Sequence, residues 1–401
     1  MLKNYSSIVG KAELRSIETL AEKLGNVSIT HINSTRFGGG VAEILKSLVP
    51  LQKSLGMKTS WIVMRAPRAF FEVTKSFHNA LQGALLPLDD TMKNLYLEFN
   101  EKNARRRGFE ADFVTVHDPQ PAALVKFCNP RVGKWLWRCH VDLTSPNPDY
   151  WKYLSSFLDY YDALIFSLDR YVKNAQHKRA LVISPSIDPL TEKNRTLSGD
   201  QISKVVHRFD VNPEKPILTQ VARFDPLKNP LGAIDVYRMV KQKIPSLQLV
   251  LIGSMADDDP EGIEWRRKTL DYAKGDGDIK VLSNLAAKEV NAFQRASSVI
   301  IQMSLSEGFG ITVTEALWKG VPVVASRVGG IPLQVLDGFT GYLGDSTEQA
   351  AARVGQLLNN RRLASQLGRH GHDHVKLNFL ITRQLKQYLQ LYIQLLEPTH
   401  S

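Results

Sequence analysis

The chain alternates, along nearly its whole length, between short apolar runs rich in β-branched residues and longer amphipathic stretches. Strands that alternate with helices of about 10–15 residues favour parallel sheets, because a right-handed crossover carries each helix over a face of the sheet. The pattern therefore predicts an α/β fold of Rossmann-like units. The expected strands are Val27–Ile32, Thr59–Met64, Phe113–His117, Lys134–Cys139, Ala163–Phe166, Ala180–Ile183, Ile217–Val221, Leu247–Gly253, Lys280–Leu282, Val299–Met303 and Val321–Ala325.

The length of the chain and a proline-rich break indicate that these strands belong to two domains. A chain of 401 residues is long for one domain, and two domains of roughly 150–200 residues each are expected. A proline-rich break at Ser184–Pro189 separates the two series. We therefore predict one domain over residues 1–185, a second over residues 186–378, and a final amphipathic helix within residues 379–401.

The segment Ser306–Glu315 carries the clearest functional signal. It follows the apolar run Ser298–Met303, contains a glycine-rich turn and leads into a helical pattern. A strand, a glycine turn and a helix start together present backbone N–H groups and a positive helix end to an anion such as phosphate. Glu307 and Glu315 frame the turn, and carboxylates suit the hydroxyls of a sugar. The segment indicates a nucleotide-sugar pocket; an ordinary turn with two solvated glutamates is the alternative.

A second strand end carries two cations. Arg223 and Lys228 follow the apolar segment Pro216–Thr219, and the carboxyl ends of parallel strands form the edge where ligands bind. A guanidinium grips phosphate with a planar fork, and an ammonium adds a mobile point charge. Either cation alone is usually a solvated surface charge. Together with Glu307, they predict a clamp for a diphosphate.

These motifs resemble those of the retaining glycosyltransferases of the GT-B fold, family 4. The cations Arg223 and Lys228, and the seven residues between Glu307 and Glu315, carry the likeness, which covers nearly the whole chain. Further segments resemble trehalose glycosyltransferring synthases within that family: His31–Glu43, Thr74–Gly83, His117–Pro121, Trp137–Leu143 and Arg208–Asp210. The resemblance implies two Rossmann-like domains whose parallel sheets face a central cleft, with a last helix that crosses back to the first domain.

The resemblance also implies an activity. Trehalose synthases of this kind transfer glucose from a nucleoside diphosphate glucose, here ADP- or UDP-glucose, to free glucose with retention, and the reaction can run backwards. Two alternatives stay open. One is a retaining trehalose phosphorylase, in which inorganic phosphate replaces the nucleotide diphosphate. The other is a non-catalytic sensor of nucleotide-sugars, which the intact Glu307, Glu315, Arg223 and Lys228 disfavour.

The resemblance assigns roles to residues of both domains. The expected catalytic residues are Glu307, Arg223, Lys228 and His117. The expected donor-binding residues are Gly39, Gly40, Leu285, Gly308, Phe309, Gly310, Ile311, Thr312 and Glu315, with Glu315 on the ribose and Leu285 near the base. The expected acceptor-binding residues are Asn33, Asp118, Arg138, His140 and Asp142. A lone histidine at a strand end is more often a packing residue, and a glycine triplet is as often only a tight turn.

No tightly bound cofactor or metal is expected. The run Asp257–Asp259 lies beside a proline and indicates a solvated loop, so Mg²⁺ would bind through the diphosphate of the substrate. The net charge of +11 reflects solvated Lys and Arg or a field that attracts an anionic donor. Because no nucleic-acid-binding motif is present, a nucleic-acid partner is not expected.

The same sequence indicates neither a signal peptide nor a membrane span. Cys128 and Cys139 are the two cysteines and are expected to be reduced thiols. We therefore expect a cytoplasmic protein without a membrane partner, and the resemblance adds the expectation of a homodimer.

Overall fold

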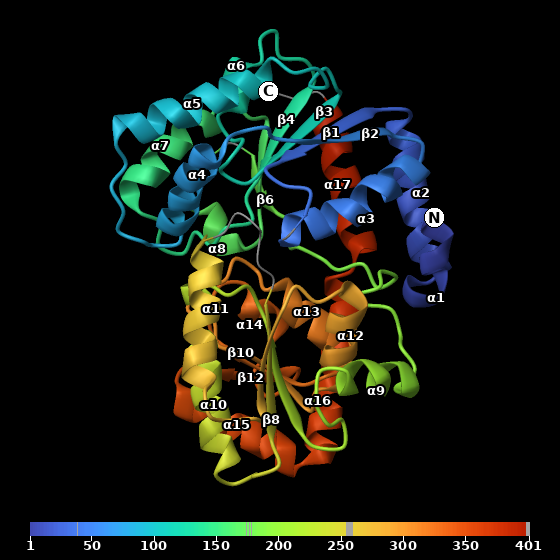
Figure 1. The fold of residues 1–401 in the computed structure, drawn as a ribbon. Coiled ribbons are helices and arrows are strands. Elements are labelled where there is room, and N and C mark those ends of the chain that lie inside the picture. The colour runs from blue at the N-terminus through green and yellow to red at the C-terminus, as the bar shows by residue number, and fades with distance from the viewer. Residues whose placement is uncertain (38, 174, 176, 178, 254–259, 398–401) are drawn as a thin grey trace. The chain divides into compact units, whose positions relative to one another are not determined.

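The computed structural model describes residues 1–37, 39–173, 175, 177, 179–253 and 260–397 (Figure 1). The run Asp257–Asp259 lies outside these residues. The chain forms two compact units. Unit 1 contains Met1–Ser186 and Ile381–Ser401, and unit 2 contains Ile187–Leu380. Among the described residues, no helix combines the length and the apolar character needed to cross a bilayer.

Unit 1 is built around a six-stranded parallel sheet with the order β2-β1-β3-β4-β5-β6. Its strands are β1 (Ser28–Asn33), β2 (Lys58–Val63), β3 (Phe113–His117), β4 (Lys134–Arg138), β5 (Ala163–Phe166) and β6 (Ala180–Val182). Because β2 and β3 lie on opposite sides of β1, the topological switch point falls between β1 and β3. The carboxyl ends of these two strands are Asn33 and His117.

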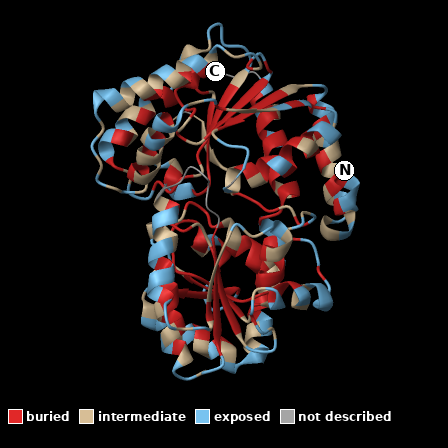
Figure 2. Ribbon diagram, in the orientation of Figure 1, coloured by how far each residue is buried: buried red, intermediate tan, exposed pale blue. Residues whose placement is uncertain are grey.

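Helices cover both faces of this sheet. They are η1 (Leu2–Tyr5), α1 (Ser6–Val9), α2 (Lys11–Leu24), α3 (Gly40–Ser54), α4 (Arg68–Leu81), α5 (Asp90–Ala104), α6 (Leu124–Phe127), α7 (Pro148–Leu158), α8 (Asp169–Val172) and α17 (Ile381–Leu396). Figure 2 shows the strands buried at the centre and the exposed residues on the outer sides of the helices. The core includes Trp135 and Trp137, both with 0% exposure.

The last helix, α17, packs on α2 and α3 of unit 1. The apolar face of this predicted amphipathic helix is buried, and it includes Leu385, Tyr388, Leu389, Leu391, Tyr392 and Leu395. Tyr392 stacks on Phe113 of β3 with ring centroids 4.3 Å apart. Lys386 forms an ion pair of 2.9 Å with Glu13 of α2. A segment from the far end of the chain therefore completes the hydrophobic core of unit 1.

Unit 2 repeats the architecture with a six-stranded parallel sheet in the order β12-β11-β10-β7-β8-β9. Its strands are β7 (Ile217–Val221), β8 (Gln248–Gly253), β9 (Ile279–Ser283), β10 (Val299–Gln302), β11 (Val323–Ser326) and β12 (Gly341–Gly344). Its helices are α9 (Gly199–His207), η2 (Pro226–Lys228), α10 (Pro230–Lys241), α11 (Pro260–Ala273), α12 (Ala287–Ala296), α13 (Ile311–Trp318), α14 (Ile331–Gln334), α15 (Thr347–Asn359) and α16 (Arg361–Asn378). The strand β12 was not among those expected.

The burial of α17 gives a first prediction. Leu389 has 0% exposure, whereas Leu396 on the same helix has 52%. Leu389→Ala leaves a cavity in a close-packed core and should lower the free energy of opening of unit 1 by about 2–5 kcal/mol. Leu396→Ala removes the same atoms from solvent and should change it by less than about 0.5 kcal/mol. Hydrogen exchange of the β3 amides measures both; equal effects would contradict the packing described.

Candidate functional site

The candidate site of unit 2 lies where the strand order of its sheet reverses. The strands β7 and β10 are neighbours, but β8 and β9 extend the sheet beyond β7, and β11 and β12 extend it beyond β10. Open α/β sheets bind ligands at the carboxyl ends of such a pair. Arg223 and Lys228 follow β7, and Glu307 follows β10. The two sequence signals therefore meet at one edge of one sheet.

The loop after β7 is shaped by side chains that cap its turns. Asp225 accepts a hydrogen bond of 2.8 Å from the backbone N–H of Leu227 and starts the short helix η2. Asn229 has a left-handed backbone, with φ of 47°, and its Oδ1 accepts from the Gly232 N–H at 3.1 Å. These contacts end η2 and begin α10 within one residue. Lys228, between them, is held in a fixed orientation.

A buried amide joins this loop to the loop after β10. Oε1 of Gln220 accepts from the Met303 N–H at 3.0 Å, and its Nε2 donates to the Lys228 carbonyl at 3.1 Å. The Leu305 N–H donates to the Leu227 carbonyl at 2.7 Å. Gln220 has 3% exposure, so its hydrogen bonds are shielded from water. Sequence reasoning missed this residue, although an amide inside an otherwise apolar strand is a signal.

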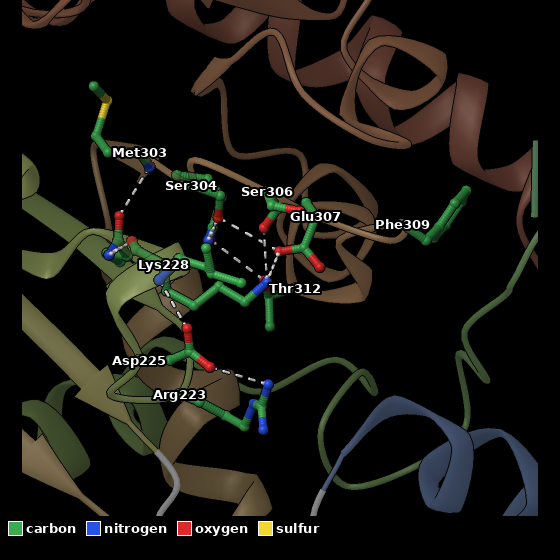
Figure 3. Close-up of polar contacts among 12 residues, drawn as sticks. Arg223, Asp225, Lys228, Met303, Ser304, Ser306, Glu307, Phe309 and Thr312 are labelled. Atoms are coloured by element: carbon green, nitrogen blue, oxygen red, sulfur yellow. Dashed lines mark hydrogen bonds and ion pairs between the residues drawn. The ribbon is translucent and has the colours of Figure 1, made fainter. Parts of the chain in front are cut away.

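Lys228 and Glu307 form the centre of the site (Figure 3). Nζ of Lys228 lies 2.8 Å from Oε2 of Glu307 and donates to the Ser306 carbonyl at 3.1 Å. The two side chains are only 12% and 15% exposed. A largely buried charge requires a partner, and each of these two supplies it for the other. An anion that approached Lys228 would therefore compete directly with the Glu307 carboxylate.

Arg223 is held differently. Its Nη2 lies 3.3 Å from Oδ2 of Asp225, and the side chain is 38% exposed (Figure 3). The structure therefore brings Lys228 to Glu307 but leaves the Arg223 guanidinium on the neighbouring Asp225. The Arg223 guanidinium is partly exposed and pairs with a single carboxylate. It can turn toward a ligand at small cost, because exposed ion pairs contribute little to stability.

Two glycines after β11 press against the Glu307 turn. A Cβ on Gly329 would lie 1.3 Å from the Glu307 carbonyl oxygen, and a Cβ on Gly330 would lie 2.8 Å from Cα of Phe309. Gly329 also has φ of 53°, which favours glycine. The backbone of the turn is thus fixed by another backbone in direct contact. Sequence reasoning did not single out these glycines.

The turn leads into the uncapped start of α13. Gly310 is the N-cap, with φ of 86° and ψ of 58°, and no side chain caps the helix. Nearby, Gln334 donates from Nε2 to the Phe309 carbonyl, and the Thr314 hydroxyl donates to Oε1 of Gln334 at 2.5 Å. The first amides of α13, from Ile311 onward, therefore form a rigid, electropositive helix end of the kind that binds phosphate.

Glu315 lies on α13 and is 2% exposed. Its Oε1 pairs with Nζ of Lys193 at 3.0 Å, whereas Oε2 is buried without a hydrogen-bond partner in the described structure. Lys319 donates to the Glu315 carbonyl at 3.1 Å and to Oδ1 of Asn194 at 3.0 Å, and burial lowers its pKa to about 7. An unsatisfied buried carboxylate oxygen is an acceptor for a ligand hydroxyl. Sequence reasoning missed Lys193 and Lys319.

Leu285 lies apart from these residues. It follows β9 at the far edge of the sheet and packs, half-buried, against the hydrophobic cluster that contains Val221 and Phe293. Between β9 and β7, the nearest strand of the site, lies β8. The expected contact of Leu285 with the nucleotide base therefore stays a prediction.

In unit 1 the predicted residues also gather at strand ends, but most are internal. His117, an expected catalytic residue, is internal: it is 1% exposed and lies between His31 and His140. Arg138 has 0% exposure, and its Nη1 donates to the Phe166 carbonyl at 3.0 Å. Nε and Nη2 of Arg138 are buried without a hydrogen-bond partner in the described structure, so this guanidinium is only partly satisfied.

Three further residues that were expected to bind the acceptor form hydrogen bonds within unit 1. Asp118 has φ of 67°, its Oδ1 accepts from the His140 N–H at 2.7 Å, and burial raises its pKa to about 7. Asp142 accepts from the Thr144 N–H at 2.9 Å and from the Tyr171 hydroxyl at 2.9 Å. Oδ1 of Asn33 accepts from Nε1 of Trp61 at 2.8 Å.

The glycine turn before α3 has the predicted character. Gly39 has φ of 92° and serves as N-cap of α3 without a side-chain cap, and Gly40 is the first residue of the helix. A positive φ is the physical reason for glycine here. Gly38, the first glycine of the triplet, lies outside the described residues. In the part of the chain that the structure describes, no group of three His, Cys, Asp or Glu side chains could hold a metal ion.

Comparisons with known proteins agree with this geometry. Residues 31–173 match the family model described as the N-terminal domain of trehalose synthase, and residues 203–374 match glycosyl transferases group 1. A trehalose synthase from Thermococcus litoralis is 51% identical over 396 residues, which cover 97% of this chain and 96% of that relative. The chain belongs to the trehalose synthase family.

This member of the trehalose synthase family also has more distant relatives. A trehalose phosphorylase from Pleurotus pulmonarius is 28% identical over 431 residues, which cover 93% of this chain and 58% of that protein. The solved structure of a trehalose-6-phosphate synthase superimposes with a TM-score of 0.76 at 13% identity, covering 92% and 99% of the two chains. The family, the GT-B fold and the glycosyltransferase class that the motifs predicted are confirmed.

The close approach at Gly329 gives a second prediction for this trehalose synthase family member. Gly329→Ala combines a positive φ with a collision against Glu307, whereas Gly275→Ala, with φ of 91° and nothing within 4 Å, carries only the conformational cost. That cost is roughly 1–2 kcal/mol. The Gly329 variant should lose more, roughly 3 kcal/mol or above, with faster hydrogen exchange in residues 304–310. If the two variants exchanged alike there, the backbone contact would not hold the turn.

Proposed function

We propose that this chain is a retaining glucosyltransferase that forms trehalose from a nucleoside diphosphate glucose and free glucose. The observation that carries the proposal is the Lys228–Glu307 contact beside the uncapped start of α13. It occurs in a chain about half identical to a trehalose synthase over nearly its whole length. A cation, a carboxylate and a helix start at one sheet edge suit a leaving diphosphate attached to a sugar.

In this proposal the diphosphate binds at the positive side of the site. Lys228 and the first amides of α13 contact phosphate oxygens, and the half-exposed Arg223 turns from Asp225 to join them. These groups stabilise the negative charge that develops as the glycosidic bond to the diphosphate breaks. Preorganised donors have their largest effect in that role, because they need no reorganisation during the reaction. Any Mg²⁺ would be held through the diphosphate itself.

Glu307 would serve the donor glucose. Retaining hydrolases use a carboxylate as nucleophile, but the Glu307 carboxylate is engaged by Lys228 and approached by the Ser304 hydroxyl at 3.4 Å. A carboxylate held in this way is fixed to accept sugar hydroxyls and to support an oxocarbenium-like charge. The departing phosphate then takes the proton of the acceptor hydroxyl. Glu315, with its unsatisfied Oε2, would accept the ribose hydroxyls.

Free glucose would be bound by the strand ends of unit 1, where His140 is mostly buried but partly accessible and Asp118 holds its backbone. Glucose is rich in hydroxyls, so it requires several polar partners in fixed positions. A homodimer and a cytoplasmic location are further parts of the proposal, and they rest on the resemblance of the sequence alone.

The reverse reaction tests the proposal. Purified protein is incubated with trehalose and either ADP or inorganic phosphate, and the sugar products are identified. We expect glucose and ADP-glucose in the presence of the nucleotide. Glucose 1-phosphate formed only with phosphate would make the protein a phosphorylase. The forward reaction is tested with ADP- or UDP-glucose and glucose. Binding of ADP without turnover in either direction would indicate a non-catalytic sensor.

Lys228 supplies the third prediction. Lys228→Met keeps the aliphatic stem but removes the charge opposite the leaving group, so kcat should fall by about 10²–10³. Lys376→Met, at an exposed position of α16, is the matched control and should leave kcat unchanged. The rate of trehalose formation at saturating donor and glucose gives both values. A loss confined to the KM for the donor would show that Lys228 binds the ground state and does not stabilise the leaving group.

Glu315 supplies the fourth prediction. Glu315→Gln removes the charge that would hold the ribose hydroxyls, and a hydrogen bond to a charged group contributes about 1.5–3 kcal/mol. The KM for ADP-glucose should therefore rise by roughly 10–100-fold with little change in kcat. Glu348→Gln, on the exposed start of α15, should change neither. With a 2′,3′-dideoxyribose donor the Glu315 effect should disappear; if it persisted, Glu315 would act elsewhere.

A further inference from the structure

Behind His140, three buried side chains continue a line of hydrogen bonds into unit 1. Nε2 of His140 lies 3.2 Å from Nδ1 of His117, and Nε2 of His117 lies 3.1 Å from Nδ1 of His31. Nε2 of His31 lies 3.0 Å from Oε1 of Gln52 on α3. The line thus joins β4, β3, β1 and α3 in order. None of its inner members can reach a ligand, because His31, His117 and Gln52 are 0–1% exposed.

All three imidazoles in this line are neutral at physiological pH. Burial lowers the pKa of His31 to about 4. Burial also lowers the pKa of His117 and His140 well below their ordinary value, and the Arg138 charge adds to the effect for both. A neutral imidazole carries one N–H donor and one lone pair, on different nitrogens. Each ring in the line can therefore donate in one direction only.

The amide of Gln52 sets that direction. A carbonyl oxygen only accepts, so Nε2 of His31 carries the proton and its Nδ1 is a lone pair. Nε2 of His117 must then donate to His31, which leaves Nδ1 of His117 to accept from Nε2 of His140. Nδ1 of His140, which has no hydrogen-bond partner among the described residues, is left as the lone pair. The opposite assignment needs the Gln52 amide rotated by 180°, and it reverses all three rings.

The structure places the oxygen of the Gln52 amide, rather than its nitrogen, at His31. Nε2 of Gln52 is buried without a hydrogen-bond partner in the described structure. The amide oxygen is therefore the atom of Gln52 that contacts the histidine line. Gln52 lies on α3, the helix that begins at the Gly39–Gly40 turn.

We propose that Gln52 is a positioning residue that fixes the tautomer of His140 through His31 and His117, so that Nδ1 of His140 accepts a hydrogen bond from a sugar hydroxyl. The assignment to a sugar rests on the proposed function; the tautomer itself does not. The backbone N–H of His140 is held by Asp118 at 2.7 Å, so the ring has a fixed position as well as a fixed polarity. The line therefore selects ligands that present a donor, a hydroxyl, at this point.

The tautomer is tested in the protein without substrate. Nitrogen-15 NMR of labelled histidines distinguishes a protonated ring nitrogen from a lone pair, and His140→Gln and His117→Gln assign the signals. We expect Nε2–H for His31, His117 and His140 between pH 6 and 8. Gln52→Met, close in size but without an acceptor, should give His140 a mixture of tautomers. Gln52→Glu, which keeps an acceptor oxygen, should restore the single tautomer.

Gln384→Met is the matched control, because Gln384 is equally buried in unit 1 and bonds to Ser186 instead. It should leave the histidine signals unchanged. An Nδ1–H form of His140 in the unaltered protein, or an unchanged tautomer in Gln52→Met, would overturn the relay. Neither result depends on turnover, so a failure here is distinct from a failure of the proposed function.

The sugar contact is tested with monodeoxyfluoro glucoses and the matching donor analogues. Fluorine accepts but cannot donate, so one position should lose about tenfold or more in kcat/KM through repulsion from the His140 lone pair. That discrimination should weaken in Gln52→Met and return in Gln52→Glu. A fixed tautomer with equal discrimination in all three proteins would show that the relay does not contact sugar.

Discussion

The ion pair between Lys228 and Glu307 is the contact on which the geometry of unit 2 depends. Each charge is about seven-eighths buried, so neither is stable at this sheet edge without the other. Their loops come from β7 and β10, which neighbour each other in space although β8 and β9 separate them in the chain. The Gln220 amide and the Leu305–Leu227 hydrogen bond lock the two loops in register. The sheet topology, therefore, brings the charges together, and the buried amide fixes their distance.

The positions of the other residues of the site depend on this fixed pairing of the two loops. The turn that contains Glu307 and Phe309 lies directly against the backbone at positions 329 and 330. Only glycine at these two positions permits so close an approach. The turn then enters α13 without a side-chain cap. One helical turn further on, Glu315 is surrounded by Lys193 and Lys319, and the lowered pKa of Lys319 reflects how little water reaches them. Glu315 therefore lies between two lysine side chains at this helix.

Much of this was predictable from local patterns, and the misses have physical causes. Apolar β-branched runs identified the strands of both sheets, but β12 begins and ends with glycine and forms only because β11 lies beside it. The spacing of Glu307 and Glu315 found the turn. Lys193 and Gln220 escaped detection because their role comes from residues about eighty or more positions away. His117 was placed at the correct strand end, but its burial depends on His31 and His140, which only the sheet order brings together.

The two units use polar groups in opposite ways, and the chemistry of the proposed ligands explains the difference. Unit 2 offers cations and helix N–H groups that meet a charged diphosphate, whose binding tolerates some freedom of orientation because charge attraction is not directional. Unit 1 buries neutral imidazoles, whose single N–H imposes a direction on each hydrogen bond. Glucose carries no charge, and its hydroxyls differ only in position and direction. A line of neutral rings ending at a lone pair therefore imposes a direction on the hydrogen bond that a sugar hydroxyl makes with it.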